Sequence, residues 1–90
     1  MEIKEYKFSK LEAIRHIEKV NGKRLCGFST GSAYYTGQPR VYWCFENEKS
    51  EWDNPELYGH GIKSLFFPNG NVMSMKVNIY AETFEFIVRE

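Results

Sequence analysis

Residues 9–22 constrain the fold more than any other stretch, because they carry signals for both ends of a helix. Ser9 opens the sequence S-K-L-E, in which the serine side chain and Glu12 each accept a free backbone N–H at a helix start. Four apolar residues follow at helical spacing, namely Ala13, Ile14, Ile17 and Val20. Asn21-Gly22 then supplies a glycine that tolerates positive φ, which is typical of a helix end. We therefore predict one amphipathic helix over residues 10–20.

Two further segments, near the start and the end of the chain, alternate in the manner of strands. Residues 2–8 place Tyr6 and Phe8 on one face. Residues 83–89 place three apolar residues on one face, Phe84, Phe86 and Val88. We expect these faces to point into a common core.

The runs 23–29 and 40–46 are predicted to form a hairpin. Their pairing brings together opposite charges, aromatic neighbours and a glycine beneath a tryptophan. The predicted partners are Arg24 with Glu46, Leu25 with Phe45, Cys26 with Cys44, Gly27 with Trp43, and Phe28 with Tyr42. This pairing makes a disulfide geometrically conceivable. Because the N-terminus has no signal-peptide pattern, we instead expect reduced thiols packed as small hydrophobes.

A third hairpin is predicted around Pro68-Asn69-Gly70, with strands on both sides of this turn. Proline suits the first turn position, and Gly70 is expected in the left-handed conformation. The strand after the turn places four apolar residues on one face, namely Met73, Met75, Val77 and Ile79. Residues 47–61 are expected to form a long irregular connection.

Together these elements predict one α+β domain over residues 1–90, in the order β-α-β-β-β-β-β. The expected architecture is a mainly antiparallel β-sheet of five to six strands with one amphipathic helix packed on one face. No segment has the length and apolarity of a membrane span. The expected location is the cytoplasm. The chain is expected to be a monomer or a homodimer, since the first or last strand is a candidate unpaired sheet edge.

Several kinds of chemistry are disfavoured by residue spacing. The loop 31–40 contains glycines but lacks the G-x-x-x-x-G-K-[ST] phosphate loop. Two cysteines and two histidines do not match a zinc-finger spacing, and the acidic run 46–56 lacks the order of a calcium loop. We expect no metal and no cofactor.

The distribution of aromatic residues favours protein binding. Four lie in predicted loops, Tyr34, Tyr35, Trp52 and Tyr58, with Arg40 and Asp53 close to them in sequence. Tyrosine and tryptophan dominate the energetics of protein interfaces. We therefore predict a small non-enzymatic protein-binding module that uses these six residues. Its size and type suit an inhibitor or adaptor of phage or mobile-element origin, such as an anti-CRISPR protein acting on a host defence nuclease. Alternatively, Trp52 and Tyr58 cap the open edge of the core.

Two other functions stay open. The first is a small-ligand or nucleotide-binding domain, with or without an enzymatic activity in which His60 acts as a base for Cys44 near a pocket. The second is single-stranded nucleic-acid binding by base stacking on Tyr34 and Tyr35. The formal net charge of zero argues against a nucleic-acid partner, because such proteins carry a clustered basic face.

Overall fold

The computed structural model describes residues 2–32, 39–46, 56–57 and 60–90. Their elements follow the order β1 (Ile3–Ser9), α1 (Lys10–Asn21), β2 (Leu25–Ser32), β3 (Pro39–Phe45), β4 (Glu56–Leu57), α2 (His60–Phe66), β5 (Asn71–Asn78) and β6 (Thr83–Arg89). This order confirms an α+β fold with antiparallel strands. The described elements also include a second helix, α2, which was not predicted from the sequence. Neither helix of the described segments is long and apolar enough to cross a membrane.

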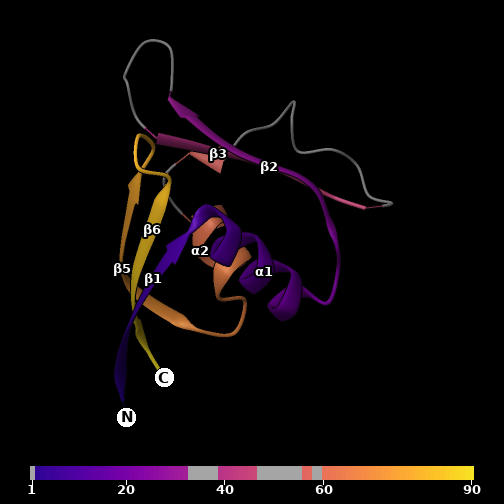
Figure 1. The fold of residues 1–90 in the computed structure, drawn as a ribbon. Coiled ribbons are helices and arrows are strands. Elements are labelled where there is room, and N and C mark those ends of the chain that lie inside the picture. The colour runs from indigo at the N-terminus through magenta and orange to yellow at the C-terminus, as the bar shows by residue number, and fades with distance from the viewer. Residues whose placement is uncertain (1, 33–38, 47–55, 58–59) are drawn as a thin grey trace.

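The described strands form two antiparallel sheets, where we had expected one. One sheet has the order β1-β6-β5, and the other has the order β2-β3-β4. Both helices lie in the angle between the two sheets (Figure 1). The inner faces of both sheets and the buried faces of both helices share one hydrophobic cluster. The rings of Phe28 and Phe84 join the sheets directly, with centroids 5.6 Å apart.

Helix α1 forms as predicted. The Glu12 backbone N–H donates to Ser9 Oγ at 3.3 Å, and the Ser9 backbone N–H donates to Glu12 Oε1 at 3.0 Å. Gly22 ends the helix with a φ of 66°. The helix buries Ala13 and Ile17 completely. The bond from the Ser9 backbone, followed by that from its side chain, lowers the pKa of the Glu12 carboxyl group.

Helix α2 replaces the first strand of the predicted third hairpin, which was expected to start at residue 62. Its first two residues belong to the segment 47–61 that was expected to be irregular, and that segment also contains β4. Within α2, Ile62, Leu65 and Phe66 are buried, and they recur at the i, i+3 and i+4 positions of a helix. A strand would place Ile62 and Leu65 on opposite faces. The helix ends before Pro68, which restricts the conformation of the preceding residue. The segment Pro68–Gly70 is therefore a helix-to-strand turn and not a hairpin loop.

The β2–β3 pairing follows the predicted register only at its start. Leu25 pairs with Phe45 as expected, but a bulge then shifts the register, so that Gly27 faces Cys44 and Phe28 faces Trp43. Leu25 and Phe28 are three residues apart, and strict alternation cannot place both toward the core. The extra residue of the bulge resolves this conflict.

Cys26 and Cys44 form a disulfide, so the expectation of reduced thiols is wrong for this structure. Their Cα atoms are 5.4 Å apart, well within the range that a disulfide spans. The bulge places Cys26 beside Cys44 although the two are not partners in the ladder.

The predicted inward face of β5 is wrong at Met73, because this strand contains a similar bulge. The register shifts between Val72 and Ser74, which leaves Met73 exposed. Val72 then packs against the core together with the buried Met75 and Val77. The predicted inward face of β6 is confirmed, since Phe84, Phe86 and Val88 are all buried.

Candidate functional site

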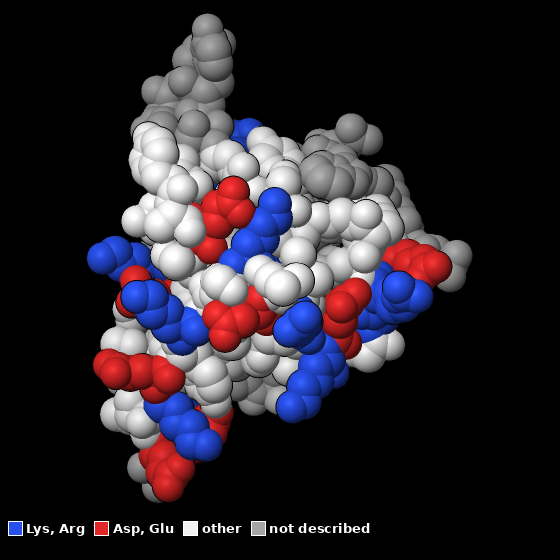
Figure 2. Space-filling model, viewed as in Figure 1, with Lys and Arg blue, Asp and Glu red and all other residues white. Residues whose placement is uncertain are grey.

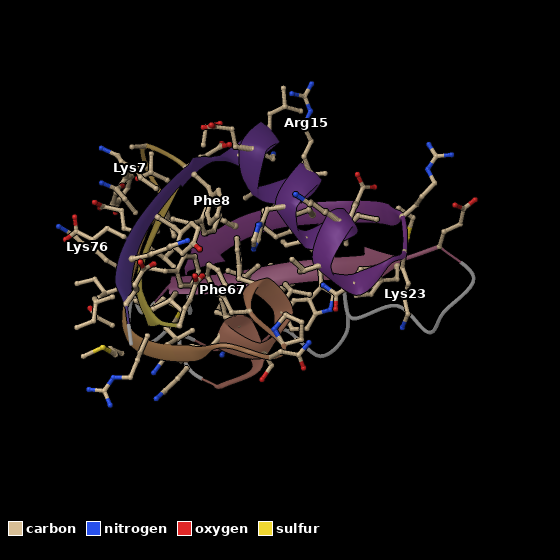
Figure 3. The ribbon with its side chains drawn as sticks, turned by 90° about the horizontal axis from the view of Figure 1, so that it is seen from below. Lys7, Phe8, Arg15, Lys23, Phe67 and Lys76 are labelled. Carbon is tan, nitrogen blue, oxygen red and sulfur yellow. A yellow bond between two sulfur atoms is a disulfide. The ribbon has the colours of Figure 1, made fainter. Side chains whose placement is uncertain are left out.

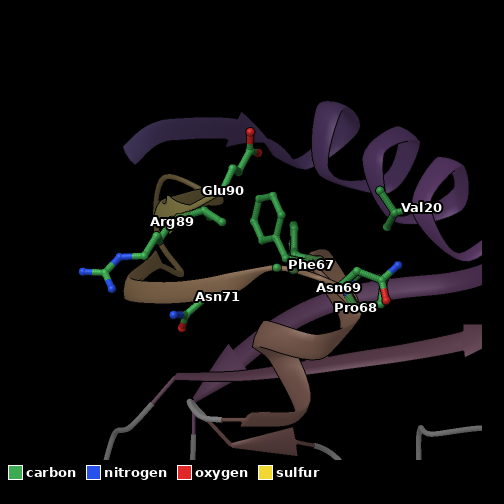
Figure 4. Close-up of a pocket in the computed structure, with 10 residues that line it drawn as sticks. Val20, Phe67, Pro68, Asn69, Asn71, Arg89 and Glu90 are labelled. Carbon is green, nitrogen blue, oxygen red and sulfur yellow. The ribbon is translucent and has the colours of Figure 1, made fainter. Parts of the chain in front are cut away.

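A groove of about 630 Å³ lies where the end of α1, the α2–β5 turn and the end of β6 meet (Figure 4). Val20 forms one wall, and Phe67 and Pro68 form the other. The buried residues Phe66 and Val88 contribute its apolar base. Asn69, Asn71, Arg89 and Glu90 also line the groove, so its surface is mixed. Concave sites of this volume are the usual place for a bound side chain or small molecule. We refer to this hollow as the Phe67 groove.

Phe67 holds its position through close packing at Gly70. A Cβ atom at Gly70 would lie 3.1 Å from the Cβ of Phe67 and 3.3 Å from Cγ1 of Val88. The Gly70 backbone N–H also donates to the Phe67 carbonyl oxygen at 3.2 Å. The described glycine with positive φ is Gly22, so the predicted left-handed role of Gly70 is wrong. Glycine is needed at position 70 because a side chain there would be too close to Phe67 and Val88.

An aromatic cluster continues from the Phe67 groove toward β1. The Phe67 ring centroid lies 4.9 Å from that of Tyr6, 5.0 Å from His16 and 5.1 Å from Phe86. His16 also stacks on Phe8 at 4.6 Å. Phe8 and Phe67 are labelled in Figure 3 and lie near each other, with ring centroids 6.4 Å apart. Tyr6, Phe8, His16 and Phe67 are only partly buried, so this cluster reaches the surface.

Polar bonds tie α1 to α2 beside this cluster. His16 Nε2 lies 2.6 Å from the Phe66 carbonyl oxygen, which makes Nε2 the donor. The Asn21 side-chain amide donates to the carbonyl oxygens of Ile17 and Leu65, each at 2.9 Å. These bonds satisfy the Leu65 and Phe66 carbonyl groups in the last turn of α2, which have no partner within that helix. The walls of the Phe67 groove are therefore fixed relative to each other.

Glu90, a charged residue that lines the groove, is already bonded to other side chains of the protein. Tyr6 Oη donates to Glu90 Oε1 at 2.5 Å, and Lys4 Nζ lies 3.2 Å from Glu90 Oε2. The bond from Tyr6, and then that from Lys4, lowers the pKa of Glu90, and the same bond to Glu90 raises the pKa of Tyr6. The Arg89 side chain points away from Val20 and Phe67 in Figure 4. Charged side chains thus do not converge on the interior of the groove.

A second exposed feature lies at the tip of the β5–β6 hairpin, residues 79–82. Tyr80 is 94% exposed there. Asn78 Oδ1 accepts hydrogen bonds from the backbone N–H groups of Tyr80 and Ala81, both at 3.0 Å. This Asx turn fixes the backbone that carries Tyr80.

Most of the site residues predicted from the sequence lie outside the described residues, namely Tyr34, Tyr35, Trp52, Asp53 and Tyr58. His60 begins α2, but its side chain is also outside them. Arg40 lies in β3 opposite Gly31, and its Nε is buried with no hydrogen-bond partner within the described chain. Cys44 is bonded to Cys26 and has no thiolate to serve as a nucleophile.

Sequence reasoning missed Val20, Phe67 and Tyr80 as surface features. Phe67 was assigned to a strand, and the helical spacing of Ile62, Leu65 and Phe66 was the signal that could have corrected this. For Tyr80, the available signal was an asparagine two residues earlier, a common start of a turn.

Among the described side chains, no group of three or more His, Cys, Asp or Glu residues is arranged to hold a metal ion. No protein-family model matches the chain, and neither a curated protein nor a solved structure is significantly similar to it.

Proposed function

We propose that this protein is a protein-binding module without catalytic activity, and that it holds an apolar side chain of its partner in the Phe67 groove. The observation that carries this proposal is a surface groove of about 630 Å³ lined by Val20, Phe67 and Pro68. Interface anchors are often apolar or aromatic side chains that become buried in a concave site of the partner. Val20 keeps 37% of its surface exposed in the free protein, and a partner would cover it.

The character of the groove supports a protein side chain over a small polar ligand. Sites for metabolites combine an apolar wall with a few polar groups that converge on the ligand. Here Glu90 is occupied by Tyr6 and Lys4, and Arg89 is directed elsewhere. The alternative that pairs His60 with Cys44 loses its nucleophile while the disulfide is intact.

Charge distribution supports the same choice over a nucleic acid. Basic and acidic side chains are interspersed on the face shown in Figure 2, without a continuous basic area. Nucleic-acid affinity depends on neutralising successive phosphates, and it falls steeply with added salt. A partner bound through the Phe67 groove should instead stay bound when salt is raised.

The narrower form of the proposal is an inhibitor or adaptor of phage or mobile-element type. Its support is the size and class of the domain. The predicted loop residues Tyr34, Tyr35, Trp52 and Tyr58 remain part of the proposed contact surface. Action in the cytoplasm also remains a prediction. The Cys26–Cys44 disulfide bears on it directly, because disulfides are rare in the reducing cytosol.

Two glutamate substitutions on the same helix test the proposal. Val20→Glu places a charge in the groove wall, whereas Leu11→Glu places one at a residue of α1 that is 57% exposed and does not line the groove. Glutamate is a good helix former at both positions. Tagged wild-type protein and both variants are used to recover partners from nuclease-treated lysate of the source, with melting temperature as the folding control.

We expect Val20→Glu to reduce recovery of a stoichiometric protein partner at least tenfold, equivalent to about 1.4 kcal/mol of binding free energy. Leu11→Glu should retain the partner. Equal recovery by all three proteins would show that the groove does not bind the partner. Loss of binding by both variants with intact folding would show that any added charge on α1 weakens binding, and would not support the groove as the binding site.

A further inference from the structure

The tip of the β5–β6 hairpin has the properties of a second, separate contact site. Tyr80 has the largest exposed fraction among the large hydrophobic residues in the described part of the chain. Aromatic side chains of this size bury much area at little entropic cost, which is why they anchor interfaces. We propose that Tyr80 is an anchor that inserts into an uncharged apolar pocket on a partner protein.

The backbone beneath Tyr80 is organised before any partner binds. Asn78 Oδ1 holds the N–H groups of both Tyr80 and Ala81. Glu82, which ends the turn, has a φ of 52°, a conformation that residues other than glycine adopt infrequently. Its carboxylate lies 3.8 Å from Lys10 Nζ on α1. A prearranged loop loses less conformational freedom on binding, so its affinity is higher for the same contact.

The chemistry of the tip selects an apolar pocket. The N–H groups of Tyr80 and Ala81 are already satisfied by Asn78, so burying them in a partner leaves no unpaired donor. The Glu82 charge is balanced by Lys10. The turn residues Ile79, Tyr80 and Ala81 carry no charge to pair with phosphates. These features fit a dry pocket on a protein and not a nucleic acid.

This site is independent of the Phe67 groove. The groove lies at the end of the β5–β6 ladder where Asn71 pairs with Arg89. The tip follows the other end, where Asn78 pairs with Thr83. Strand β5 has eight residues, so the two ends are roughly 23 Å apart at about 3.3 Å per residue. A variant of one site therefore leaves the other unchanged.

Substitutions at Tyr80 test this inference separately from the proposed function. Tyr80→Ala removes the ring, Tyr80→Phe keeps its apolar body, and Val20→Glu disturbs only the groove. Each variant is used to recover partners from nuclease-treated source lysate, and affinity for each recovered protein is then measured with purified components. Sedimentation velocity of the purified chain measures self-association.

We expect at least one recovered protein to bind Tyr80→Ala tenfold or more weakly, with Tyr80→Phe within about threefold of wild type. The melting temperature of Tyr80→Ala should stay within about 1 °C of wild type, because the side chain is nearly free. Recovery that is equal for wild type and Tyr80→Ala, or the absence of any Tyr80-dependent protein, would overturn the inference. Tyr80-dependent self-association would assign the tip to a second copy and overturn the partner proposed here. A protein lost only with Val20→Glu would support the groove proposal alone.

Discussion

A Cβ atom at Gly70 would lie 3.1 Å from the Cβ of Phe67, closer than such atoms normally approach. The wall of the Phe67 groove therefore depends on a residue that has no side chain. Val88 Cγ1 closes the same space from β6, at 3.3 Å from that Cβ position. The turn between α2 and β5 is thus packed directly onto the central strand of the first sheet.

Gly70→Ala should destabilise the protein by about 1–3 kcal/mol, because the added methyl group forces Phe67 or the turn to move. Thermal or denaturant unfolding measures this change. The control is Gly22→Ala, where no atom lies within 4 Å and the obstacle is the φ of 66°. Asparagine tolerates that conformation, so Gly22→Asn should recover part of the loss. Asparagine at position 70 should recover none, and equal recovery at both positions would contradict the packing explanation.

Glu82→Gly should stabilise the protein by about 0.5–1 kcal/mol. Glycine adopts the φ of 52° without steric cost, and the exposed ion pair with Lys10 that it removes contributes little. Glu82→Ala removes the same ion pair but keeps the unfavourable φ, so it should not raise the melting temperature. If alanine stabilises as much as glycine does, the backbone conformation is not the cause.

Reduction of the Cys26–Cys44 disulfide should lower the free energy of unfolding by about 3 kcal/mol. The bond closes a loop with a sequence separation of 18, and breaking it restores entropy to the unfolded chain. For a domain of this size the melting temperature should fall by roughly 12–24 °C. A double variant with alanine at both cysteines should melt at the lower temperature whether or not reductant is present. An unchanged wild-type melting temperature in reductant would contradict this expectation.

Glu12→Gln should reduce stability at neutral pH and have a smaller effect in acid. The pKa of Glu12 is lowered in the folded protein by its bonds with Ser9. The resulting stabilisation is present above the carboxyl pKa of the unfolded chain and is lost as pH falls through the folded pKa. Glutamine can still accept the Ser9 N–H, so the difference reports the charge. Melting temperatures of both proteins from pH 7 to pH 3 should converge, and a constant difference would argue against this role.

Local signals in the sequence were sufficient for the elements that carry their own end markers. The capping box at Ser9 and Glu12, together with Gly22, specified α1 because each acts through bonds within a few residues. Strict alternation specified β6, which is the central strand of its sheet. These elements need little information from the rest of the chain.

Features set by tertiary packing were not predictable in this way. The segment 62–67 has both an apolar run and a turn signal, and its choice of helix is consistent with Ile62, Leu65 and Phe66 facing one core. The two bulges, at Cys26 and Met73, each resolve a spacing of three between core residues, which alternation alone cannot represent. The Phe67 groove arises where α1, the turn and β6 meet, so no single segment contains it.

Amide hydrogen exchange of the chain, free and bound to its recovered partner, tests the groove proposal most directly. If an apolar side chain of the partner fills the Phe67 groove, the backbone amides of residues 67, 69, 70 and 71 should exchange more slowly in the complex, as should those at the end of α1. Residues 11–13 near the start of α1, which do not line the groove, should change little. Unaltered exchange at residues 67–71, with protection confined to other segments, would contradict binding at this groove.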